Sequence, residues 1–161
     1  MTKAWMVRAG RGGLFIDDFI NNNLVAIGWN LLGELSQLQA DAQLKAAYIQ
    51  YYGNEKPNKT ANALSMLRRF YHEIQPGDWL LTYSPKQRLY HIGEDLNQYE
   101  YRHCDTGLYA NIRRVNWLGT VKRDCLSANS RSSLGSVLSL FTVKEKVRLE
   151  IESQLARDVS V

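Results

Sequence analysis

The chain opens with an alternation of apolar and polar residues that predicts a short strand over residues 3–8. A glycine-containing turn follows over 9–13, and apolar residues at helical spacing within 14–20 predict an amphipathic helix. A run of asparagines ends this helix. The apolar run over 24–29 then has the composition of a buried strand that ends in an aromatic residue, Trp29. We therefore expect a strand, a turn, a helix and a second strand in this first part of the chain.

The rest of the chain alternates between helical and strand patterns. Apolar residues three or four positions apart predict helices within 33–53, over 63–74 with Asn58 or Thr60 as N-cap, and from Ser127 through Phe141; strand patterns cover 79–83, 88–94, 99–102 and 111–120. The last stretch, 143–158, is a charged helix with a thin apolar stripe of Val147, Ile151 and Leu155, which buries little by itself. This order predicts one α+β domain, a pseudo-barrel of about five or six short, mostly antiparallel strands with inserted and C-terminal helices.

Length and composition are those of a single globular domain. The chain has 161 residues, of which 45% are hydrophobic and 22% charged, so one core can form and wholesale disorder is excluded. The net charge of +4 favours a polyanionic partner, although proteins that bind no polyanion often carry a charge of this size. The N-terminus enters its apolar alternation without a leader segment, and no apolar run approaches the length of a membrane span. We therefore expect a cytoplasmic protein that does not interact with a membrane.

No pattern of residues predicts a catalytic or metal site. Asp17 and Asp18 are adjacent, so on a helix their side chains would point about 100° apart and could not serve one site. A Cys104 nucleophile beside His103 is equally weak, because neighbours on an extended chain face opposite ways. The histidines and cysteines also lack the spacings of zinc sites or disulfide frameworks: His72, His91, His103, Cys104 and Cys125. We expect no catalytic residue, no metal ligand and no cofactor, and hence a chain that is not an enzyme by itself.

The glycine turn after the first strand is a candidate contact for phosphate. Glycine-rich turns that precede a helix expose backbone N–H groups to anions. This turn has neither the Gly-Lys-Ser ending of a Walker sequence nor the continuation of a GxGxxG fingerprint, so as a signal for nucleotide binding it is weak. Because Arg8 and Arg11 flank Gly10, the turn could hold a phosphodiester. A plain tight turn is the alternative.

Aromatic residues are interleaved with arginines in the β-rich middle of the chain. Tyr83 and Tyr90 lie close in sequence to Arg88, and this mixture is what stacking on exposed bases requires. The alternative is that the aromatic residues fill the core of a small barrel, and for any single tryptophan this interpretation is favoured. Trp29 is the exception, because it ends a strand and precedes a polar residue. A ring in such a place often faces a cleft.

Several segments resemble known nucleic-acid-binding domains. The sequences AWMVRAG at 4–10, VAIGW at 25–29, RRF at 68–70 and QPGDWLLTY at 75–83 are similar to those of EVE-like members of the PUA superfamily. Together with IGE at 92–94, VNWL at 115–118 and SRSSLGS at 130–136, they resemble more closely the N-terminal domain of Mrr-type restriction endonucleases. The resemblance covers about residues 1–143. We therefore expect 1–143 to be an EVE/PUA-like nucleic-acid-binding domain.

The resemblance implies a pocket for a flipped base, as in related readers of modified nucleotides. Trp29 matches the tryptophan that forms one wall of the aromatic cage in YTH-like relatives, and Asn30 beside it could hydrogen-bond a base edge. Trp79 or Tyr83 would form the second wall. The chain has Arg8-Ala9 where YTH proteins have Lys-Ser, so recognition of methyladenine is not implied. The expected nucleic-acid contacts are Arg8, Gly10, Arg11, Trp29, Asn30, Trp79, Tyr83, Ser84, Arg88 and Arg131.

The function that this resemblance implies is the DNA-binding specificity module of a modification-dependent, Mrr-type restriction system. The partner would be DNA, plain or with a modified cytosine or another modified base. Residues 144–161 would form a helical linker toward a nuclease domain of the same full-length chain, which this sequence does not contain. Two alternatives stay open: an RNA-binding PUA-like domain, and a protein or small-ligand interaction domain with a filled aromatic core. A continuous positive surface around Arg8, Arg11 and Trp29 would favour DNA.

Overall fold

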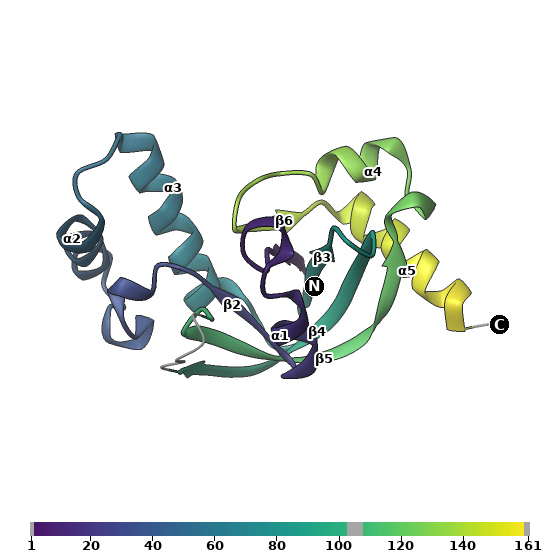
Figure 1. Ribbon diagram of the computed structural model, residues 1–161, viewed down its shortest axis with the longest axis horizontal. Helices are drawn as coiled ribbons and strands as arrows, with labels where there is room; N and C mark the ends of the chain where they lie inside the picture. The colour runs from purple at the N-terminus through teal and green to yellow at the C-terminus, as the bar shows by residue number, and fades with distance from the viewer. Residues whose placement is uncertain (1, 103–107, 160–161) are drawn as a thin grey trace.

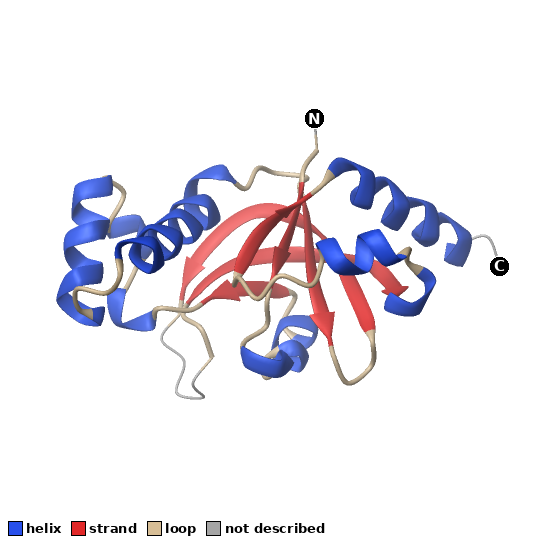
Figure 2. Cartoon of the chain, turned by 90° about the horizontal axis from the view of Figure 1, so that it is seen from above, coloured by secondary structure: helices blue, strands red, loops and turns tan. Residues whose placement is uncertain are grey.

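A six-stranded mixed sheet with helices on both faces forms the domain (Figure 1 and Figure 2). The computed structural model describes residues 2–102 and 108–159, so His103 and Cys104 lie outside the described residues. The strands are β1 (Ala4–Val7), β2 (Leu24–Ile27), β3 (Trp79–Ser84), β4 (Leu89–Tyr101), β5 (Asn111–Lys122) and β6 (Leu140–Val143), in the order β2-β5-β4-β3-β1-β6. Neighbouring strands are antiparallel except β1 and β3, which are parallel.

The helices gather at opposite ends of the sheet. The pair α2 (Asp41–Tyr52) and α3 (Pro57–Arg68) lies at one end, whereas α4 (Ala128–Ser133) and α5 (Glu145–Val159) lie at the other (Figure 1). A short helix, α1 (Ile16–Asn21), follows the glycine turn, and a π-helical turn over Arg69–Glu73 continues α3. In the part of the chain that the structure describes, no helix is both long enough and apolar enough to cross a membrane.

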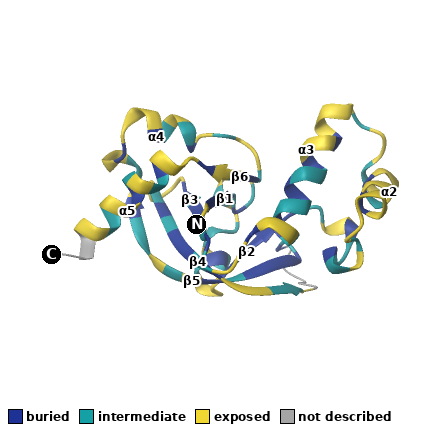
Figure 3. Cartoon of the chain, turned by 180° about the vertical axis from the view of Figure 1, so that it is seen from behind, coloured by how far each residue is buried: buried dark blue, intermediate teal, exposed yellow. Residues whose placement is uncertain are grey.

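The two-residue period of the strands divides the core into two clusters, one on each face of the sheet. In β1, Trp5 and Val7 face the first cluster, and Ala4 and Met6 face the second. The first cluster also contains buried side chains of α1, α2 and α3, and the second contains those of α5. Figure 3 shows that buried residues are concentrated in the strands. All residues of β1 are buried, so this strand runs through the middle of the molecule.

The predicted α+β class is confirmed, but the expected closure into a barrel is wrong. β2 and β6 stand at the two ends of the strand order, and among the described residues no pairing joins them. The long strands β4 and β5 bend at two irregularities of their register, between Ile92 and Gly93 and between Asp95 and Tyr99. The sheet therefore curves without closing.

The helix expected from Ser127 through Phe141 is confirmed only in its first part, and its continuation to Phe141 is wrong. α4 ends at Ser133, shortly before Gly135, and the chain then forms the edge strand β6. Phe141 lies opposite Met6 of β1 in the antiparallel register, and Val137 is 86% exposed instead of facing a core. After α4 ends, the apolar residues within 140–143 therefore lie in a strand. A four-residue strand is too short for its pattern to be separated from a helical one.

Two other boundaries differ from the expectation. α3 begins at Pro57, with Lys56 rather than Asn58 or Thr60 at the N-cap position. Proline suits the first helical position because its fixed φ and missing N–H cost nothing there. The strands expected at 88–94 and 99–102 are two halves of β4, which a bulge separates.

The C-terminal helix packs on the sheet. Val147 and Ile151 are buried in the second core cluster, and Leu155 packs against that cluster. The guanidinium carbon of Arg148 lies 5.7 Å from the centroid of the Trp79 ring, which adds a cation–π contact between α5 and β3. The thin apolar stripe is thus sufficient to attach this helix to the folded domain.

Two buried carboxylates organise the polar contacts of the core. The side chain of Asp78 accepts hydrogen bonds from the backbone N–H of Lys3 at 3.1 Å and from the indole Nε1 of Trp5 at 3.0 Å, and it also accepts from the backbone N–H of Gln75 at 2.9 Å. These bonds hold the start of β1 beside the turn that precedes β3.

The second carboxylate, that of Asp95, forms a buried ion pair with Arg113. Nε and Nη2 of Arg113 each donate to a carboxylate oxygen of Asp95 at 2.9 Å. The same guanidinium donates to the carbonyl oxygens of Phe70 at 3.2 Å and Ile74 at 3.4 Å. The pair therefore attaches the π-helical turn after α3 to strands β4 and β5.

We predict that Arg113→Met destabilises the domain by about 3–5 kcal/mol, because the Asp95 carboxylate stays buried without its partner. The neighbouring Arg114 forms a more exposed ion pair with Glu100, so Arg114→Met should cost about 1 kcal/mol or less. Urea unfolding of the two variants measures the difference. Equal losses of stability in both variants would contradict the structural role of the Asp95–Arg113 pair.

We also predict a pH dependence of stability that originates at His91. Burial lowers the pKa of this imidazole, and its Nε2 has no hydrogen-bond partner. The unfolded chain therefore binds a proton at His91 more readily than the folded domain does. The free energy of unfolding should decrease as the pH falls through the ordinary histidine pKa of about 6.5, and this contribution should level off below the lowered pKa of the folded state.

The measurement is urea unfolding at several pH values between about 5 and 7.5, the range in which histidine titrates. His91→Phe should flatten the dependence, because it removes the titrating group and keeps a ring beside Trp117. His72→Phe, which changes an exposed histidine, is the matched control and should retain the slope. An unchanged slope in His91→Phe would show that another group is responsible.

Candidate nucleic-acid interface

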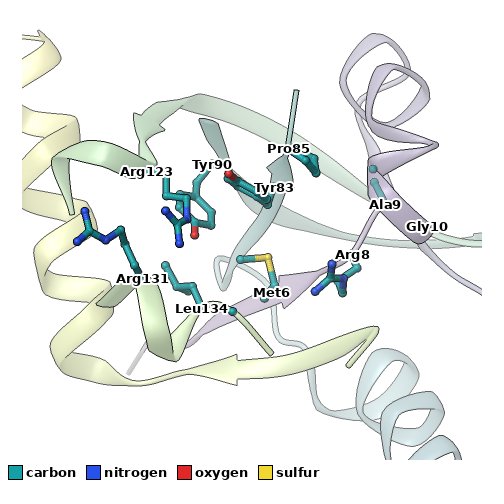
Figure 4. A pocket seen from close by; sticks show the side chains of 12 residues that line it. Met6, Arg8, Ala9, Gly10, Tyr83, Pro85, Tyr90, Arg123, Arg131 and Leu134 are labelled. Carbon is teal, nitrogen blue, oxygen red and sulfur yellow. The ribbon is translucent and has the colours of Figure 1, made fainter. Parts of the chain in front are cut away.

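A pocket of about 230 Å³ opens at the carboxyl end of β1 (Figure 4). Its walls come from segments that are far apart in the sequence: the end of β1 with the glycine turn, the β3–β4 hairpin, the short helical turn Arg123–Cys125, and α4 with the residues that follow it. We call it the arginine pocket, because Arg8, Arg123 and Arg131 line it.

The glycine turn closes one side of this pocket against the hairpin. Gly10, Gly12 and Gly13 have φ angles of 77°, 65° and 77°, in the left-handed region that other residues rarely adopt. A Cβ on Gly13 would lie 2.8 Å from Cδ of Pro85, which is closer than carbon atoms can pack. Glycine is therefore required where the turn meets the hairpin.

Three separate elements each contribute one arginine to the pocket. Arg8 extends from the end of β1, and its Nη1 donates to the carbonyl oxygen of Ser136 at 2.6 Å. Arg123 begins the helical turn after β5, and Arg131 belongs to α4. In Figure 4, Arg123 and Arg131 lie toward one side of the pocket and Arg8 lies toward the other. Positive charge thus borders the pocket on both sides.

The arginines of this region differ from seven others in having no carboxylate partner within residues 2–102 and 108–159. Seven arginines form ion pairs with Asp or Glu: Arg68, Arg69, Arg88, Arg102, Arg113, Arg114 and Arg148. Among the described residues, no carboxylate oxygen lies within the ion-pair distance of 4.0 Å from Arg8, Arg11, Arg123 or Arg131. The pocket lining itself contains no Asp or Glu. Its positive charge is therefore not neutralised by the pocket itself.

Two acidic residues near Arg123 and Arg131 have other partners. Asp124 pairs with Arg88, with 2.5 Å between Oδ1 and Nη2. Glu150 accepts a hydrogen bond from the backbone N–H of Ser127 at 3.0 Å. The hydrogen bond from Arg88 is the main cause that lowers the pKa of Asp124, and the charges of Arg123 and Arg131 contribute to the lowering. These carboxylates therefore place negative charge near Arg123 and Arg131 without forming an ion pair with them.

Two tyrosines form the aromatic wall of the pocket. Tyr83 and Tyr90 pair across the β3–β4 ladder, with ring centroids 4.6 Å apart. Burial is the main cause that raises the pKa of the Tyr90 hydroxyl, and the charge of Arg123 partly opposes it. The hydroxyl is therefore protonated at neutral pH and can donate a hydrogen bond. Tyr83 is only half-buried, so part of its ring is accessible in the pocket.

A second depression, of about 440 Å³, adjoins the arginine pocket and shares Arg8 and Gly10 with it. We call it the glycine-turn hollow; its lining also includes Arg11, Gly12, Tyr109, Val137 and Ser139. The Tyr109 ring packs edge-on against Phe15, with centroids 4.9 Å apart, and lies 3.2 Å from where a Cβ on Gly28 would be. The hollow therefore reaches from the glycine turn to the end of β2.

The structure brings together part of the residue set expected from the sequence. Arg8, Gly10, Tyr83 and Arg131 line the arginine pocket, and Arg11 lines the glycine-turn hollow with Arg8 and Gly10. These residues belong to three segments of the chain: the connection after β1, strand β3 and helix α4. The glycine turn is thus the centre of the candidate interface.

Trp29 and Asn30, also expected as contacts, are not among the lining residues of either depression. Trp29 is half-buried, packs against the first core cluster and has a left-handed φ of 62°. The side chain of Asn30 accepts from the backbone N–H of Ala110 at 3.0 Å and donates to the carbonyl oxygen of Leu108 at 3.3 Å. Its amide is therefore engaged in holding the loop before β5.

Three further expected contacts lie outside both depressions. Trp79 stacks under Arg148 of α5, at the opposite end of β3 from Tyr83. The hydroxyl of the buried Ser84 accepts from the backbone N–H of Gln87 at 3.3 Å, within the hairpin turn. Arg88, at the end of that turn, is held by Asp124. None of these three lines the arginine pocket or the glycine-turn hollow.

Sequence reasoning missed Arg123, Tyr90 and Tyr109 as site residues. Arg123 follows a strand pattern within a mixed-charge run, and nothing local distinguishes it from Lys122. Tyr90 and Tyr109 were part of the aromatic enrichment but had no individual signal. Across residues 2–102 and 108–159, no group of three or more His, Cys, Asp or Glu side chains is placed to hold a metal ion.

Comparison with known proteins gives a family and no function. No curated protein matches the chain. A family model described as a domain of unknown function (DUF8426) matches residues 5–143, from the second residue of β1 to the end of β6. The match includes both depressions and spans most of the chain. The protein therefore belongs to this DUF8426 family.

Proposed function

We propose that this domain binds nucleic acid across the arginine pocket and the glycine-turn hollow, as the DNA-binding specificity module of an Mrr-type restriction system. One observation carries the proposal. Arg8, Arg11, Arg123 and Arg131, which have no carboxylate partner among the described residues, surround two adjoining depressions, whereas seven other arginines of the domain are ion-paired.

Grouping these guanidinium groups has an energetic cost that a ligand would remove. Like charges repel, and a cluster without carboxylates destabilises the free protein. Phosphate oxygens relieve this repulsion, and the planar guanidinium can donate two parallel hydrogen bonds to them. A nucleic-acid strand supplies such phosphates at regular intervals. A strand that crosses from the hollow to the pocket would meet Arg11 first, then Arg8, then Arg123 and Arg131.

Aromatic rings at the same surface supply contacts for bases. Tyr83 in the pocket and Tyr109 in the hollow are both half-buried and leave part of a ring accessible. Stacking of a base on such a ring stabilises binding by about 1–3 kcal/mol. Trp29 follows Gly28, over which Tyr109 packs. In this proposal an extruded base, plain or modified, enters beside Tyr109 and reaches Trp29.

The choice of DNA rests on the resemblance of the EVE-like segments, together with 92–94, 115–118 and 130–136, to Mrr-type N-terminal domains. In this proposal the chain acts by binding, without a catalytic residue, metal or cofactor of its own. Residues 144–161 would lead to a nuclease domain of the same full-length cytoplasmic protein, with α5 as the connection.

We predict that duplex DNA binds with an affinity that falls steeply as salt rises. Displacement of counterions by the four unpaired arginines gives a slope of log K against log salt of about −3 to −4. Fluorescence anisotropy between about 50 and 200 mM salt measures this slope. Absence of binding at the lowest salt would refute the proposed function.

Arg11→Gln should reduce the magnitude of the slope by about one and weaken binding to all sequences equally, because one phosphate contact is lost. Arg68→Gln is the matched control. It removes the same charge from α3, where Arg68 pairs with Asp41, and should leave the slope unchanged. Equal effects of the two variants would indicate attraction by net charge alone, without a defined binding surface.

Trp29→Ala should weaken binding by about 1–3 kcal/mol, because it removes the stacking surface for the extruded base. The melting temperature of the variant, measured in parallel, separates loss of binding from loss of folding. A folded variant with unchanged affinity for DNA would show that Trp29 does not contact the base. Comparison of duplexes with plain and modified cytosine tests whether the site beside Tyr109 and Trp29 recognises the modification.

A further inference from the structure

We propose that the arginine pocket binds a terminal phosphomonoester, so that the domain recognises the phosphorylated end of a nucleic-acid strand. This inference deepens the proposed function and rests on it, because it takes from it that a strand crosses from the glycine-turn hollow to the arginine pocket. It assigns separate roles to the two depressions: the glycine-turn hollow contacts the interior of a strand, and the arginine pocket holds its end.

The charge of the pocket matches a dianion better than a diester. Arg123 and Arg131 lie toward the same side of the pocket, with the Arg123 guanidinium beside the hydroxyl of the buried Tyr90 and that of Arg131 farther out (Figure 4). Two guanidinium groups carry two positive charges, and with the phenol they offer several N–H and O–H donors to one phosphate. A phosphomonoester has three terminal oxygens and carries close to two negative charges at neutral pH. Its charge is therefore balanced by this arginine pair.

The surroundings of Arg123 and Arg131 favour an end over a continuing strand. Two carboxylates lie near these arginines: Asp124 pairs with Arg88, and Glu150 accepts from Ser127. A strand that continued past Arg131 would approach these carboxylates and be repelled. On the side of Asp124 and Glu150, a continuing strand is therefore disfavoured.

The remainder of the pocket fits the terminal nucleotide. Its volume of about 230 Å³ is small, and Met6 and Tyr83 lie between the arginine pair and Arg8 (Figure 4). A base or sugar can pack on the half-buried Tyr83 ring while the next phosphate reaches Arg8. Arg8 is available for this contact, because its observed hydrogen bond is to the neutral carbonyl of Ser136.

The test compares short single-stranded oligodeoxynucleotides of one sequence that carry a 5′-phosphate, a 3′-phosphate or hydroxyl groups at both ends. We expect one of the phosphorylated strands to bind about tenfold more tightly than the strand with two hydroxyl ends. Thymidine 5′-monophosphate and thymidine form a second pair of probes. This pair distinguishes a strand end from a free nucleotide as the source of the phosphomonoester.

Variants separate a specific site from the effect of added charge. Arg123→Gln and Arg131→Gln should each abolish the preference for the phosphorylated strand. Arg11→Gln should weaken binding of all strands and leave the preference intact, because Arg11 lies in the hollow. Arg68→Gln should change nothing. Melting temperatures confirm folding, and the comparison of strands on the unaltered protein does not depend on any variant.

Each outcome is decisive. Equal binding of all strands would overturn this inference and leave the proposed function intact. A preference that survives in Arg123→Gln and Arg131→Gln would also overturn it, because the phosphate would then bind elsewhere. Binding of thymidine monophosphate but of no oligonucleotide would support the phosphomonoester site and refute the proposed function. Absence of binding by every probe would refute both.

Discussion

The hydrogen bonds to the buried Asp78 carboxylate determine where the first strand lies, and the candidate interface depends on that position. β1 and β3 are parallel, so no hairpin can align them. The carboxylate accepts from Lys3 and Trp5 on one side and from Gln75 on the other, and this fixes the start of both strands. Since β1 is short and buried on both faces, its far end has little freedom. That end places Arg8 and the glycine turn at the pocket.

Arginine serves two different purposes in this domain. Arg113 is buried and pairs with Asp95, where it attaches the segment after α3 to the sheet. Arg8, Arg123 and Arg131 line an accessible pocket that contains no carboxylate. The first arrangement stabilises the fold once both partners are in place. The second leaves charges unbalanced in the free protein, a cost that is consistent with selection for an anionic ligand.

The aromatic residues show the same division. Trp5 is completely buried and donates its indole N–H to Asp78, and Trp117 packs on the core while donating to the carbonyl oxygen of Phe19 at 3.2 Å. These rings are structural, as expected for most tryptophans of a small domain. Tyr83 and Tyr109 instead expose part of their rings beside arginines. A ring with one free face next to a cation is the arrangement that base stacking needs.

The sequence by itself determined the α+β class, the early strands and helices, and the glycine turn between Arg8 and Arg11, because these follow from local periodicity and from backbone angles that only glycine adopts readily. Tertiary structure decided the open sheet, the strand β6, and the meeting of Arg8 with Arg123 and Arg131. It also decided that Arg88 is paired while Arg123 is not. Pairing depends on distances between residues remote in sequence, and no local pattern encodes those distances.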